Sequence, residues 1–428
     1  MNDSLFSSPS FLKNTNIYEI NIRQYTAEGT FNAFASHVPR LKDMGVEILW
    51  FMPIHPIGNI KRKGTLGSYY SIQDHHGVNP EFGTEEDFRN LIQKVHESGM
   101  KIVLDWVANH TAWDHVWTKS NPEFFVHDEA GSFKPPYDWD DVIQINHDEA
   151  NEQVAMINAM SYWIADFDVD GFRADLAHLT PLKFWIDARS KLTPLKKDLI
   201  WLAETEEPSY HEAFDISYTW KWMHATEKYV KKEITLKDCL NVLNEYKNDF
   251  PANALRLFFT SNHDENSWNG TEYEKYGSIA NALAVFSCTY QGVPLVYSGQ
   301  ELPNKKRLKF FDKDVIEWWK SLEFHEFYKT LFALRKRNIA VSASADVTII
   351  SYEERQKNIL AYNLTKDEDQ IFVFLNLSTE TISTDIHSNN LTGKYQNIFT
   401  GEFFEMNDTF RFEAPPGGYT ILEKINQP

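Results

Sequence analysis

An arginine and a carboxylate two residues apart close a short apolar run, GFRADLA, at positions 171–177. Alternate residues of a β-strand point to the same side, so Arg173 and Asp175 would project together beyond the end of a strand. A guanidinium beside a carboxylate favours the ionised acid, which suits a nucleophile or an electrostatic stabiliser. The pair alone is also typical of a structural ion pair, so the neighbouring motifs decide between the two interpretations.

Further acids and histidines stand at or just after the ends of other apolar runs. They are Asp105, Asn109 and His110 in DWVANHT, Glu204 in LAETEE, and His263 and Asp264 in FFTSNHDEN. If these runs are strands of one (β/α)8 barrel, their C-terminal ends share the face where such enzymes keep their active sites. Carboxylates packed together raise one another's pKa, while Arg173 would hold at least one of them ionised.

A set of carboxyl groups of which one is ionised and another protonated suits cleavage of a glycosidic bond. That reaction needs one carboxylate to attack the anomeric carbon and one carboxylic acid to protonate the leaving oxygen. Asp175 has the arginine beside it and is the predicted nucleophile. Glu204 has no basic residue nearby in the sequence and lies on an apolar strand, so it is the predicted acid. Asp264 would stabilise positive charge on the ring, and His110 and His263 would donate to sugar hydroxyls.

The elements that must position these residues alternate along the chain. From Asn16 onward, short β-branched or aromatic runs alternate with amphipathic stretches, as in βα units. Thr84 with Asp87 resembles a capping box, and Gly99 marks the end of the helix that follows. The predicted fold class is α/β, a (β/α)8 TIM barrel. Its eight candidate strands are 17–26, 46–54, 101–107, 171–177, 199–205, 213–218, 255–261 and 293–299.

Two further parts are expected around this barrel, which is predicted to occupy residues 1–341. The segment 110–147, rich in Trp, Phe, Pro and Asp, is predicted to be a short lobe inserted after strand 3. Residues 342–428 form turn-separated β runs and are predicted to be a C-terminal antiparallel β-sandwich domain. The aromatic side chains of the lobe could pack in a core or stack on sugars; they are Trp113, Trp117, Tyr137 and Trp139.

Composition limits the partners. The chain has 428 residues and a formal net charge of −19 at pH 7, which argues against nucleic acid and anionic membranes because both attract clustered Lys and Arg. No window reaches the ~20 apolar residues of a membrane helix, and the N-terminus lacks a signal-peptide pattern. As written the protein is expected to be cytoplasmic; a secreted or periplasmic protein whose signal peptide had been removed would look the same.

Cysteine and histidine spacing gives no sign of a disulfide or a catalytic metal. Cys239 and Cys288 lie far apart, each within a helical pattern, and are predicted to be buried thiols. His110 and His115 lack the spacing of a helical metal-binding pair. The prediction is therefore that no metal takes part in the chemistry and that no cofactor is required.

Four motifs resemble those of the α-amylase superfamily, glycoside hydrolase family 13, and stand in its order: DWVANH, GFRADLAH, LAETEE and FTSNHDE. VEILWFMPIHP, YYSIQDHHGVNPEFGT and GVPLVYSGQE are also similar, and the resemblance covers nearly the whole chain. It implies that Asp175 is the nucleophile, Glu204 the acid/base and Asp264 the third carboxylate. It also implies that Asp105 is the partner of Arg173. The residues that it implies for sugar binding are Tyr70, His110, Arg173 and His263.

The sequence departs from the family pattern where many members bind calcium. In those members an aspartate of the lobe assists the motif asparagine, here Asn109, but Gln144 stands at the corresponding place in VIQIN. A hard cation prefers several oxygen ligands with carboxylate charge. Structural calcium is therefore possible in this lobe but not expected.

These observations predict a retaining α-glycosidase that hydrolyses α-1,4-linked glucose oligomers or starch-like polymers. A transglycosylase or isomerase of the same superfamily, in which a sugar hydroxyl replaces water, stays open. A non-catalytic homologue, such as the ectodomain of amino-acid transporter heavy chains, lacks the acid pair, whereas this chain has all three carboxylates. The expected partner is an oligo- or polysaccharide, with no nucleic acid and no membrane.

Overall fold

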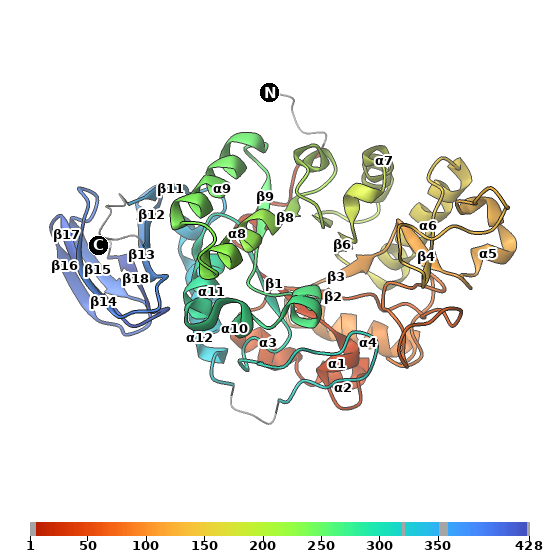
Figure 1. The fold of residues 1–428 in the computed structure, drawn as a ribbon, viewed down its shortest axis with the longest axis horizontal. Helices are drawn as coiled ribbons and strands as arrows, with labels where there is room; N and C mark the ends of the chain where they lie inside the picture. Colours follow the sequence, from red (N-terminus) through yellow and green to blue (C-terminus); the bar gives the residue numbers. More distant parts are fainter. Residues whose placement is uncertain (1–5, 319–321, 351–357, 426–428) are drawn as a thin grey trace. The chain divides into compact units, whose positions relative to one another are not determined.

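A closed barrel of eight parallel strands is the main element in the described part of the chain, in the order β1-β10-β9-β8-β7-β6-β3-β2. Figure 1 labels several of these strands, among them β1, β2 and β3. The computed structural model describes residues 6–318, 322–350 and 358–425. Every barrel strand lies within one of the eight predicted runs, so the predicted (β/α)8 barrel is confirmed. The strands are β1 (Ile17–Ile20), β2 (Ile48–Phe51), β3 (Lys101–Trp106), β6 (Gly171–Ala174), β7 (Ile200–Ala203), β8 (Ile216–Tyr218), β9 (Leu255–Phe258) and β10 (Val293–Tyr297).

The strands are shorter than the predicted runs, and the difference is largest at the first. β1 ends at Ile20, because the Asn21 side chain accepts a hydrogen bond from the Gln24 amide and caps the short helix α1 (Ile22–Tyr25). The barrel strands from β2 to β10 are buried along nearly their whole length, as expected for parallel strands that helices cover. Their polar residues therefore gather beyond the strand ends.

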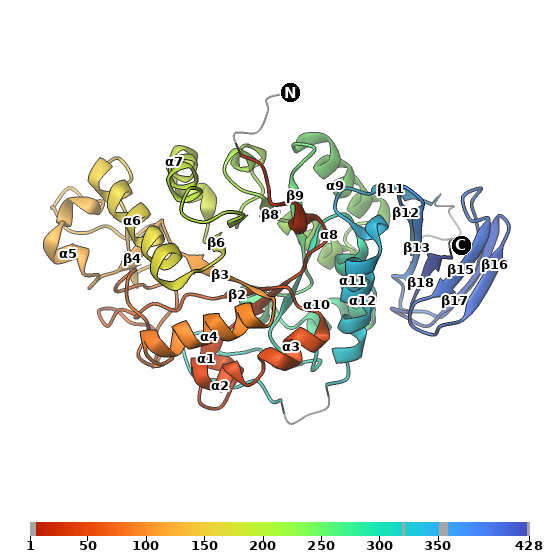
Figure 2. The same cartoon turned by 180° about the vertical axis from the view of Figure 1, so that it is seen from behind.

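Helices follow the strands as predicted, and the capping box of Thr84 and Asp87 starts the helix after β2. That helix ends at Glu97, and Gly99 follows with φ +71°. The longer helices are α3 (Val38–Met44), α4 (Glu85–Glu97), α6 (Ala150–Phe167), α7 (Leu182–Leu192), α8 (Trp220–Val230), α9 (Leu236–Asp249), α11 (Ala280–Thr289) and α12 (His325–Arg337) (Figure 2).

The lobe lies between β3 and α6 in the chain and has a small sheet of its own. β4 (His110–Ala112) pairs antiparallel with β5 (Val142–Gln144), and His110 stands opposite Gln144. The short helix α5 (Trp117–Ser120) also belongs to the lobe. Among the described residues, no helix is both long enough and apolar enough to cross a membrane.

The C-terminal region is an antiparallel β structure, as predicted. Its larger sheet has the order β11-β12-β13-β18-β15-β16, and β14 pairs with β17. Phe372, Phe374, Phe410 and Phe412 belong to its apolar core. The strands are β11 (Asp346–Ile349), β12 (Ile359–Lys366), β13 (Asp369–Asn376), β14 (Ile382–His387), β15 (Gly393–Asn397), β16 (Phe403–Met406), β17 (Thr409–Ala414) and β18 (Tyr419–Lys424).

The chain divides into two compact units that do not follow the predicted domain boundary. One comprises Met1–Ser10, Tyr18–Tyr218 and Leu308–Glu317, and the other comprises Phe11–Ile17, Thr219–Arg307 and Trp318–Pro428. The boundary at 341/342 falls inside the second unit and stays a prediction. Cys239 and Cys288 are both buried free thiols, which confirms the prediction for them.

Candidate active site

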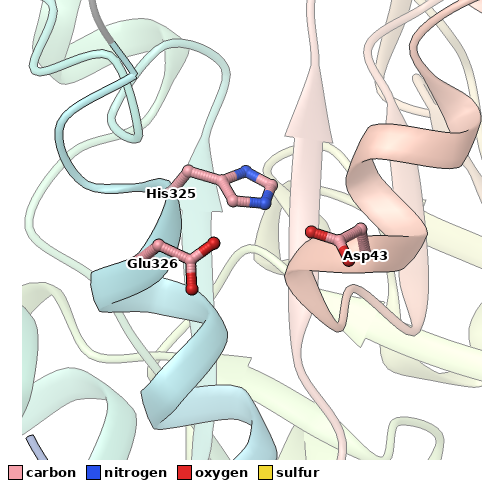
Figure 3. Close-up of side chains that lie close together, drawn as sticks. All are labelled: Asp43, His325 and Glu326. Carbon is pink, nitrogen blue, oxygen red and sulfur yellow. The ribbon is translucent and has the colours of Figure 1, made fainter.

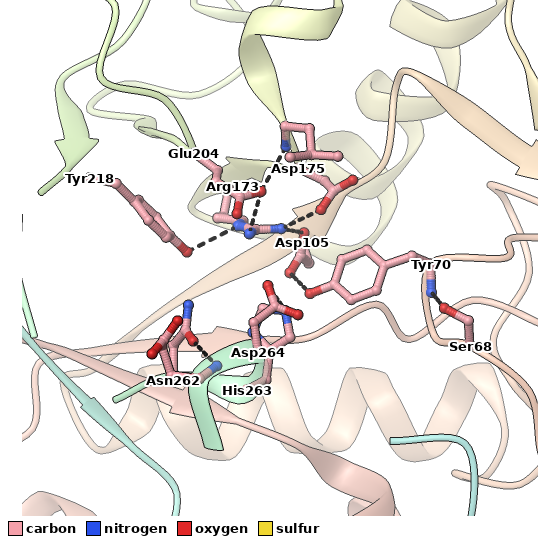
Figure 4. A network of polar contacts seen from close by, with 12 residues as sticks. Ser68, Tyr70, Asp105, Arg173, Asp175, Glu204, Tyr218, Asn262, His263 and Asp264 are labelled. Atoms are coloured by element: carbon pink, nitrogen blue, oxygen red, sulfur yellow. Dashed lines mark hydrogen bonds and ion pairs between the residues drawn. The ribbon is translucent and has the colours of Figure 1, made fainter. Parts of the chain in front are cut away.

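Arg173 lies at the centre of a buried network of acids at the ends of β3, β6 and β7 (Figure 4). Its guanidinium is fully buried, and Nη1 donates to Asp105 Oδ1 at 2.8 Å and to Asp175 Oδ1 at 2.9 Å. Nη2 lies 2.9 Å from Glu204 Oε2. Nε donates to the hydroxyl of Tyr218 at 3.3 Å. One cation thus contacts three carboxylates.

The strand register explains this arrangement. In the parallel pairs, Asp105 stands opposite Arg173 and Ala174 opposite Ala203, so Glu204 and Asp175 both come directly after paired residues. Glycine is required at position 171, the start of β6, because the backbones of β6 and β7 approach closely there. A Cβ added to Gly171 would lie 2.1 Å from the carbonyl oxygen of Ile200. The sequence GFRAD therefore needs its glycine to bring the arginine and the acids together.

The turn after β6 holds Glu204 from a second direction. Leu176 has φ +40° and ψ +50°, a left-handed conformation that is costly for a leucine. This turn directs the Leu176 amide toward Glu204, and the amide donates to Oε2 at 2.8 Å. Strained backbone of this kind concentrates at functional sites, where the surrounding structure enforces it.

The sequence analysis took Asp175 as the nucleophile because Arg173 is its neighbour in the sequence, but the structure places Arg173 against Glu204 as well. Glu204 has no basic neighbour in the sequence, but the fold places Arg173 against it. The guanidinium therefore does not by itself distinguish a nucleophile from an acid. Burial lowers the pKa of Arg173, but Asp105 and Glu204 more than offset this and hold that pKa well above its ordinary value. The arginine is a permanent cation.

Asp105 is held by two aromatic side chains as well as by the arginine. Trp50 Nε1 and the Tyr70 hydroxyl each donate to Asp105 Oδ2 at 3.1 Å. The Arg173 guanidinium also lies 4.9 Å from the centre of the Trp50 ring. With every one of these donors in place, Asp105 is fixed and in turn fixes Arg173.

His110 and Asn109 lie together where the chain enters the lobe. Asn109 Nδ2 is 3.2 Å from His110 Nδ1, and both side chains are buried. Burial and the nearby His75 lower the pKa of His110 to about 3, so its imidazole is neutral near pH 7. A neutral imidazole offers one donor and one acceptor, which suits a sugar hydroxyl.

Two further neutral histidines, His75 and His115, support the segment that carries Asn109 and His110. The Trp117 amide donates to His115 Nδ1 at 3.1 Å, and His115 Nε2 lies 3.0 Å from His75 Nδ1. His75 Nε2 is 3.0 Å from the Val107 carbonyl oxygen and so must donate to it. His115 then donates to His75. These hydrogen bonds link α5 of the lobe to the backbone two residues before Asn109.

The end of β9 carries the remaining predicted site residues. His263 Nε2 lies 3.3 Å from Asp264 Oδ2, and His263 is almost fully buried, whereas the Asp264 side chain is 37% exposed. A short π-helix, Glu265–Asn269, follows at once, and the Glu265 amide donates to Asn262 Oδ1 at 2.8 Å (Figure 4). The buried pair of Glu265 with Lys275, at 2.6 Å, fixes this segment. π-Helical turns often occur at functional sites.

Known proteins resemble this chain in sequence and in fold. The family model described as alpha amylase, catalytic domain, matches residues 8–144 and 140–316. The chain belongs to this family. A noncanonic maltogenic alpha-amylase, AmyB from Thermotoga neapolitana, has a TM-score of 0.89 and 29% identity over 97% of this chain and 100% of that one. An alpha-amylase from Lactobacillus plantarum has a TM-score of 0.88 and 28% identity over 97% and 99%.

Curated relatives of this alpha-amylase family member are longer than the chain. The alpha-amylase MalA of Haloarcula japonica is 27% identical over 394 residues, which is 88% of this chain and 57% of MalA. The alpha-1,4-glucan:maltose-1-phosphate maltosyltransferase of Rhodospirillum rubrum is 31% identical over 272 residues, 57% of this chain and 38% of that protein. The family thus contains both hydrolases and transferases.

The lobe of this alpha-amylase family member has Gln144, not an aspartate, at the place of the second calcium ligand described above. Asn109 contacts His110, and the place of the second ligand belongs to Gln144, which pairs with His110 in the lobe sheet. Within the described residues, no group of three or more close His, Cys, Asp or Glu ligand atoms includes a lobe residue. Figure 3 draws Asp43 of α3 with His325 and Glu326, which begin α12. Such surface groups are common without an ion, and we assign no metal to them.

Three residues of the network were missed by the sequence analysis. Tyr218 is the last residue of β8, so the same rule of strand ends would have found it. Trp50 lies inside β2 and looks like an ordinary core residue. Leu176 acts through its backbone amide, and no side-chain pattern reveals such a role.

Proposed function

We propose that the protein is a retaining α-glycosidase that hydrolyses α-1,4-linked glucose oligomers or starch-like polymers. The observation that carries this proposal is the buried arginine that holds two carboxyl groups, Asp175 and Glu204, at adjacent strand ends. Paired carboxyl groups of this kind are what double displacement at an anomeric carbon requires. Membership of the alpha-amylase family supports the same reaction class.

In the first step Asp175 attacks the anomeric carbon, while Glu204 gives its proton to the departing glycosidic oxygen. The products are a glycosyl ester on Asp175 and a shortened sugar chain. In the second step Glu204, now ionised, takes a proton from water, the resulting hydroxide oxygen bonds to the anomeric carbon, and the ester bond to Asp175 breaks. Two inversions leave the product with the original α configuration.

The roles of this acid pair follow from the family motifs rather than from the arginine, which contacts both groups. Glu204 contacts both the Arg173 guanidinium and the Leu176 amide. Glu204 must carry a proton when it acts as the acid in the first step. Asp175 carries no such requirement, because the nucleophile reacts ionised.

The remaining site residues bind and stabilise the reacting sugar in this proposal. Asp264 is the third carboxylate and favours positive charge on the ring, and His110 and His263 donate to hydroxyl groups that shift as the ring distorts. Tyr70 provides a ring against the sugar face while its hydroxyl stays on Asp105. Asn109 orients His110.

No cofactor is needed for these steps, because carboxyl groups supply both the nucleophile and the proton. The proposed partner is an oligo- or polysaccharide, and the negative charge of the chain argues against nucleic acid. We also propose that the lobe needs no calcium, because its residues do not match the ligand set that such a site requires.

A time course on maltoheptaose, followed by chromatography and by NMR of the first product, tests this function. Shorter maltooligosaccharides with newly formed α-anomeric ends are expected. A β-anomeric first product would exclude double displacement, and an unchanged substrate would exclude the proposed substrate class.

Transfer to a sugar hydroxyl is the second candidate, because the maltosyltransferase of Rhodospirillum rubrum is 31% identical over the part that it shares with this chain. In that case the glycosyl ester on Asp175 reacts with a sugar rather than with water. Incubation with maltotriose separates the two reactions: products longer than maltotriose indicate transfer, and glucose and maltose alone indicate hydrolysis.

A further inference from the structure

The lobe carries a row of aromatic rings that the proposed catalytic steps do not use. The Trp139 ring lies 5.7 Å from the imidazole of His110, and the Tyr137 ring lies 5.2 Å from that of Trp139, measured between ring centres. Tyr137 is 69% exposed, whereas His110 is buried. The row therefore leads from a proposed sugar-binding histidine to solvent.

The other two aromatic residues singled out in the lobe have protein groups packed against their rings. The Trp117 ring packs against His115 at 4.6 Å and Phe124 at 5.6 Å between ring centres. The ammonium of Lys61 lies 3.3 Å from the centre of the Trp113 ring. Packing thus accounts for these two tryptophans, and it does not account for Tyr137.

The segment that bears Tyr137 and Trp139 is fixed on its C-terminal side. Trp113 Nε1 donates to the Asp140 carbonyl oxygen at 2.9 Å, and Ser71 Oγ donates to that of Asp141 at 3.0 Å. Lys63 bridges the carboxylates of Asp140 and Asp141 at 2.9 and 2.8 Å. A surface that is rigid before it binds loses less conformational entropy on binding.

The backbone of Tyr137 adds to this evidence. Its φ of +51° lies in the left-handed region, where a bulky side chain costs free energy. The same turn leaves a large ring in solvent, where its apolar faces gain nothing from burial. The folded protein thus maintains an exposed ring in a strained position on a well-fixed loop.

We propose that Tyr137 and Trp139 form an outer binding surface on which glucose units of the substrate chain stack. The inference rests on the proposed function and deepens it. The C–H faces of pyranose rings are apolar, and an aromatic ring with a polar tip suits an apolar sugar face with hydroxyl groups at its rim. Units held here belong to the chain beyond the sugar that contacts His110, so long substrates benefit and short ones do not.

Tyr137→Ala tests the surface when its kcat/KM is measured on maltotriose and maltoheptaose beside the unaltered enzyme. The expected result is a roughly threefold to tenfold loss on maltoheptaose, mainly through KM, with little change on maltotriose. Tyr137→Phe keeps the ring and should retain most of the activity. Phe403→Ala, which removes a ring of equal exposure from β16, is the matched control and should change neither value.

An equal loss of kcat/KM on both substrates, or no loss on either, would contradict the proposed outer binding surface. Calorimetric binding of maltoheptaose to the same variants separates this inference from the proposed reaction. An unaltered protein that binds but does not cleave, with weaker binding in Tyr137→Ala, would support the surface and refute the hydrolase. A protein that neither binds nor cleaves maltoheptaose would refute both.

Discussion

Arg173 and Arg335 are both fully buried, yet their surroundings differ completely. Arg173 is surrounded by three carboxylates. Arg335 donates to four backbone carbonyl oxygens: those of Thr15 at 3.2 Å, Cys288 at 3.1 Å, Val341 at 3.1 Å and Gly292 at 2.7 Å. The cost of desolvating a cation is offset by opposite charges in one region and by neutral dipoles in the other.

The difference separates a reactive region from a structural one. Carbonyl groups cannot gain or lose a proton near neutral pH, so these contacts of Arg335 join the segments that carry the carbonyl groups. Three carboxyl groups surround the single positive charge of Arg173. One of them can therefore attack carbon as a carboxylate, and another can accept a proton. We therefore expect changes near Arg173 to act on turnover and changes at Arg335 to act on stability.

The largest expected effect comes from Asp175→Asn. The amide is nearly the same size and can still accept a hydrogen bond from Arg173, but it cannot form the glycosyl ester. Turnover of maltoheptaose should fall by a factor on the order of 10³ or more, with the thermal unfolding temperature close to that of the unaltered enzyme. Steady-state kinetics and calorimetry measure the two quantities.

Glu212→Gln is a suitable control for that variant, because it also neutralises an acid, but Glu212 is exposed at the end of a short helix. It should keep full turnover. Substantial activity in Asp175→Asn would exclude this residue as the nucleophile. It would also contradict the expectation that changes near Arg173 act on turnover.

Arg335→Met should have the next largest effect, and on stability alone. The change leaves four buried carbonyl groups without their donor, which we expect to lower the free energy of unfolding by about 3–5 kcal/mol. Urea denaturation measures the loss. The kcat of the molecules that remain folded should be unchanged, and a selective loss of kcat would show that Arg335 also serves the site.

Sequence reasoning found one of these arginines and missed the other for a physical reason. Arg173 was visible because its partner Asp175 is two residues away and because a strand places both on one side. The contact with Glu204 depends on the register of β6 against β7, and the partners of Arg335 are backbone atoms from distant segments. Side-chain types at short spacing can be recognised in a sequence, whereas backbone contacts between distant segments cannot.

The same distinction explains the errors in local structure. The run 17–26 has strand-like residues throughout, but Asn21 caps a helix within it, and propensity alone does not choose between the two. The left-handed turn at Leu176 has no glycine or asparagine to announce it. Both features lie at strand ends, where one hydrogen bond decides the conformation.

Acid pH should destabilise the protein through the buried histidines that support the loop beside the Arg173 network. Burial lowers the pKa of His55 and His110 to about 3 and that of His75 to about 4, and lowers that of His115 well below 6.5. Unfolded histidine binds protons near pH 6.5, so the unfolded state holds more protons below that pH. Stability is therefore complete above pH 6.5 and is lost as the pH falls toward 4.

Each such histidine contributes a slope of ~1.4 kcal/mol per pH unit within this window. Chemical denaturation at a series of pH values between 7 and 5 measures the total slope. His115→Gln keeps a polar side chain without a titrating group and should reduce the slope by one histidine. An equal slope in that variant would mean that His115 is protonated in the folded state.

Removal of metal should have the smallest effect, namely none. Protein groups join the lobe to neighbouring segments: His147 Nε2 donates to the Ala108 carbonyl oxygen at 3.0 Å, and His147 Nδ1 lies 3.0 Å from Glu152 Oε2. A site filled at 100 times its Kd would stabilise the native state by about 2.7 kcal/mol, and an empty site contributes nothing. EDTA should therefore leave both the activity and the unfolding temperature unchanged. The lobe acids Asp128, Asp138 and Asp140 are exposed and could supply oxygen ligands after a rearrangement. A fall in the unfolding temperature in EDTA that added calcium reverses would show that they do.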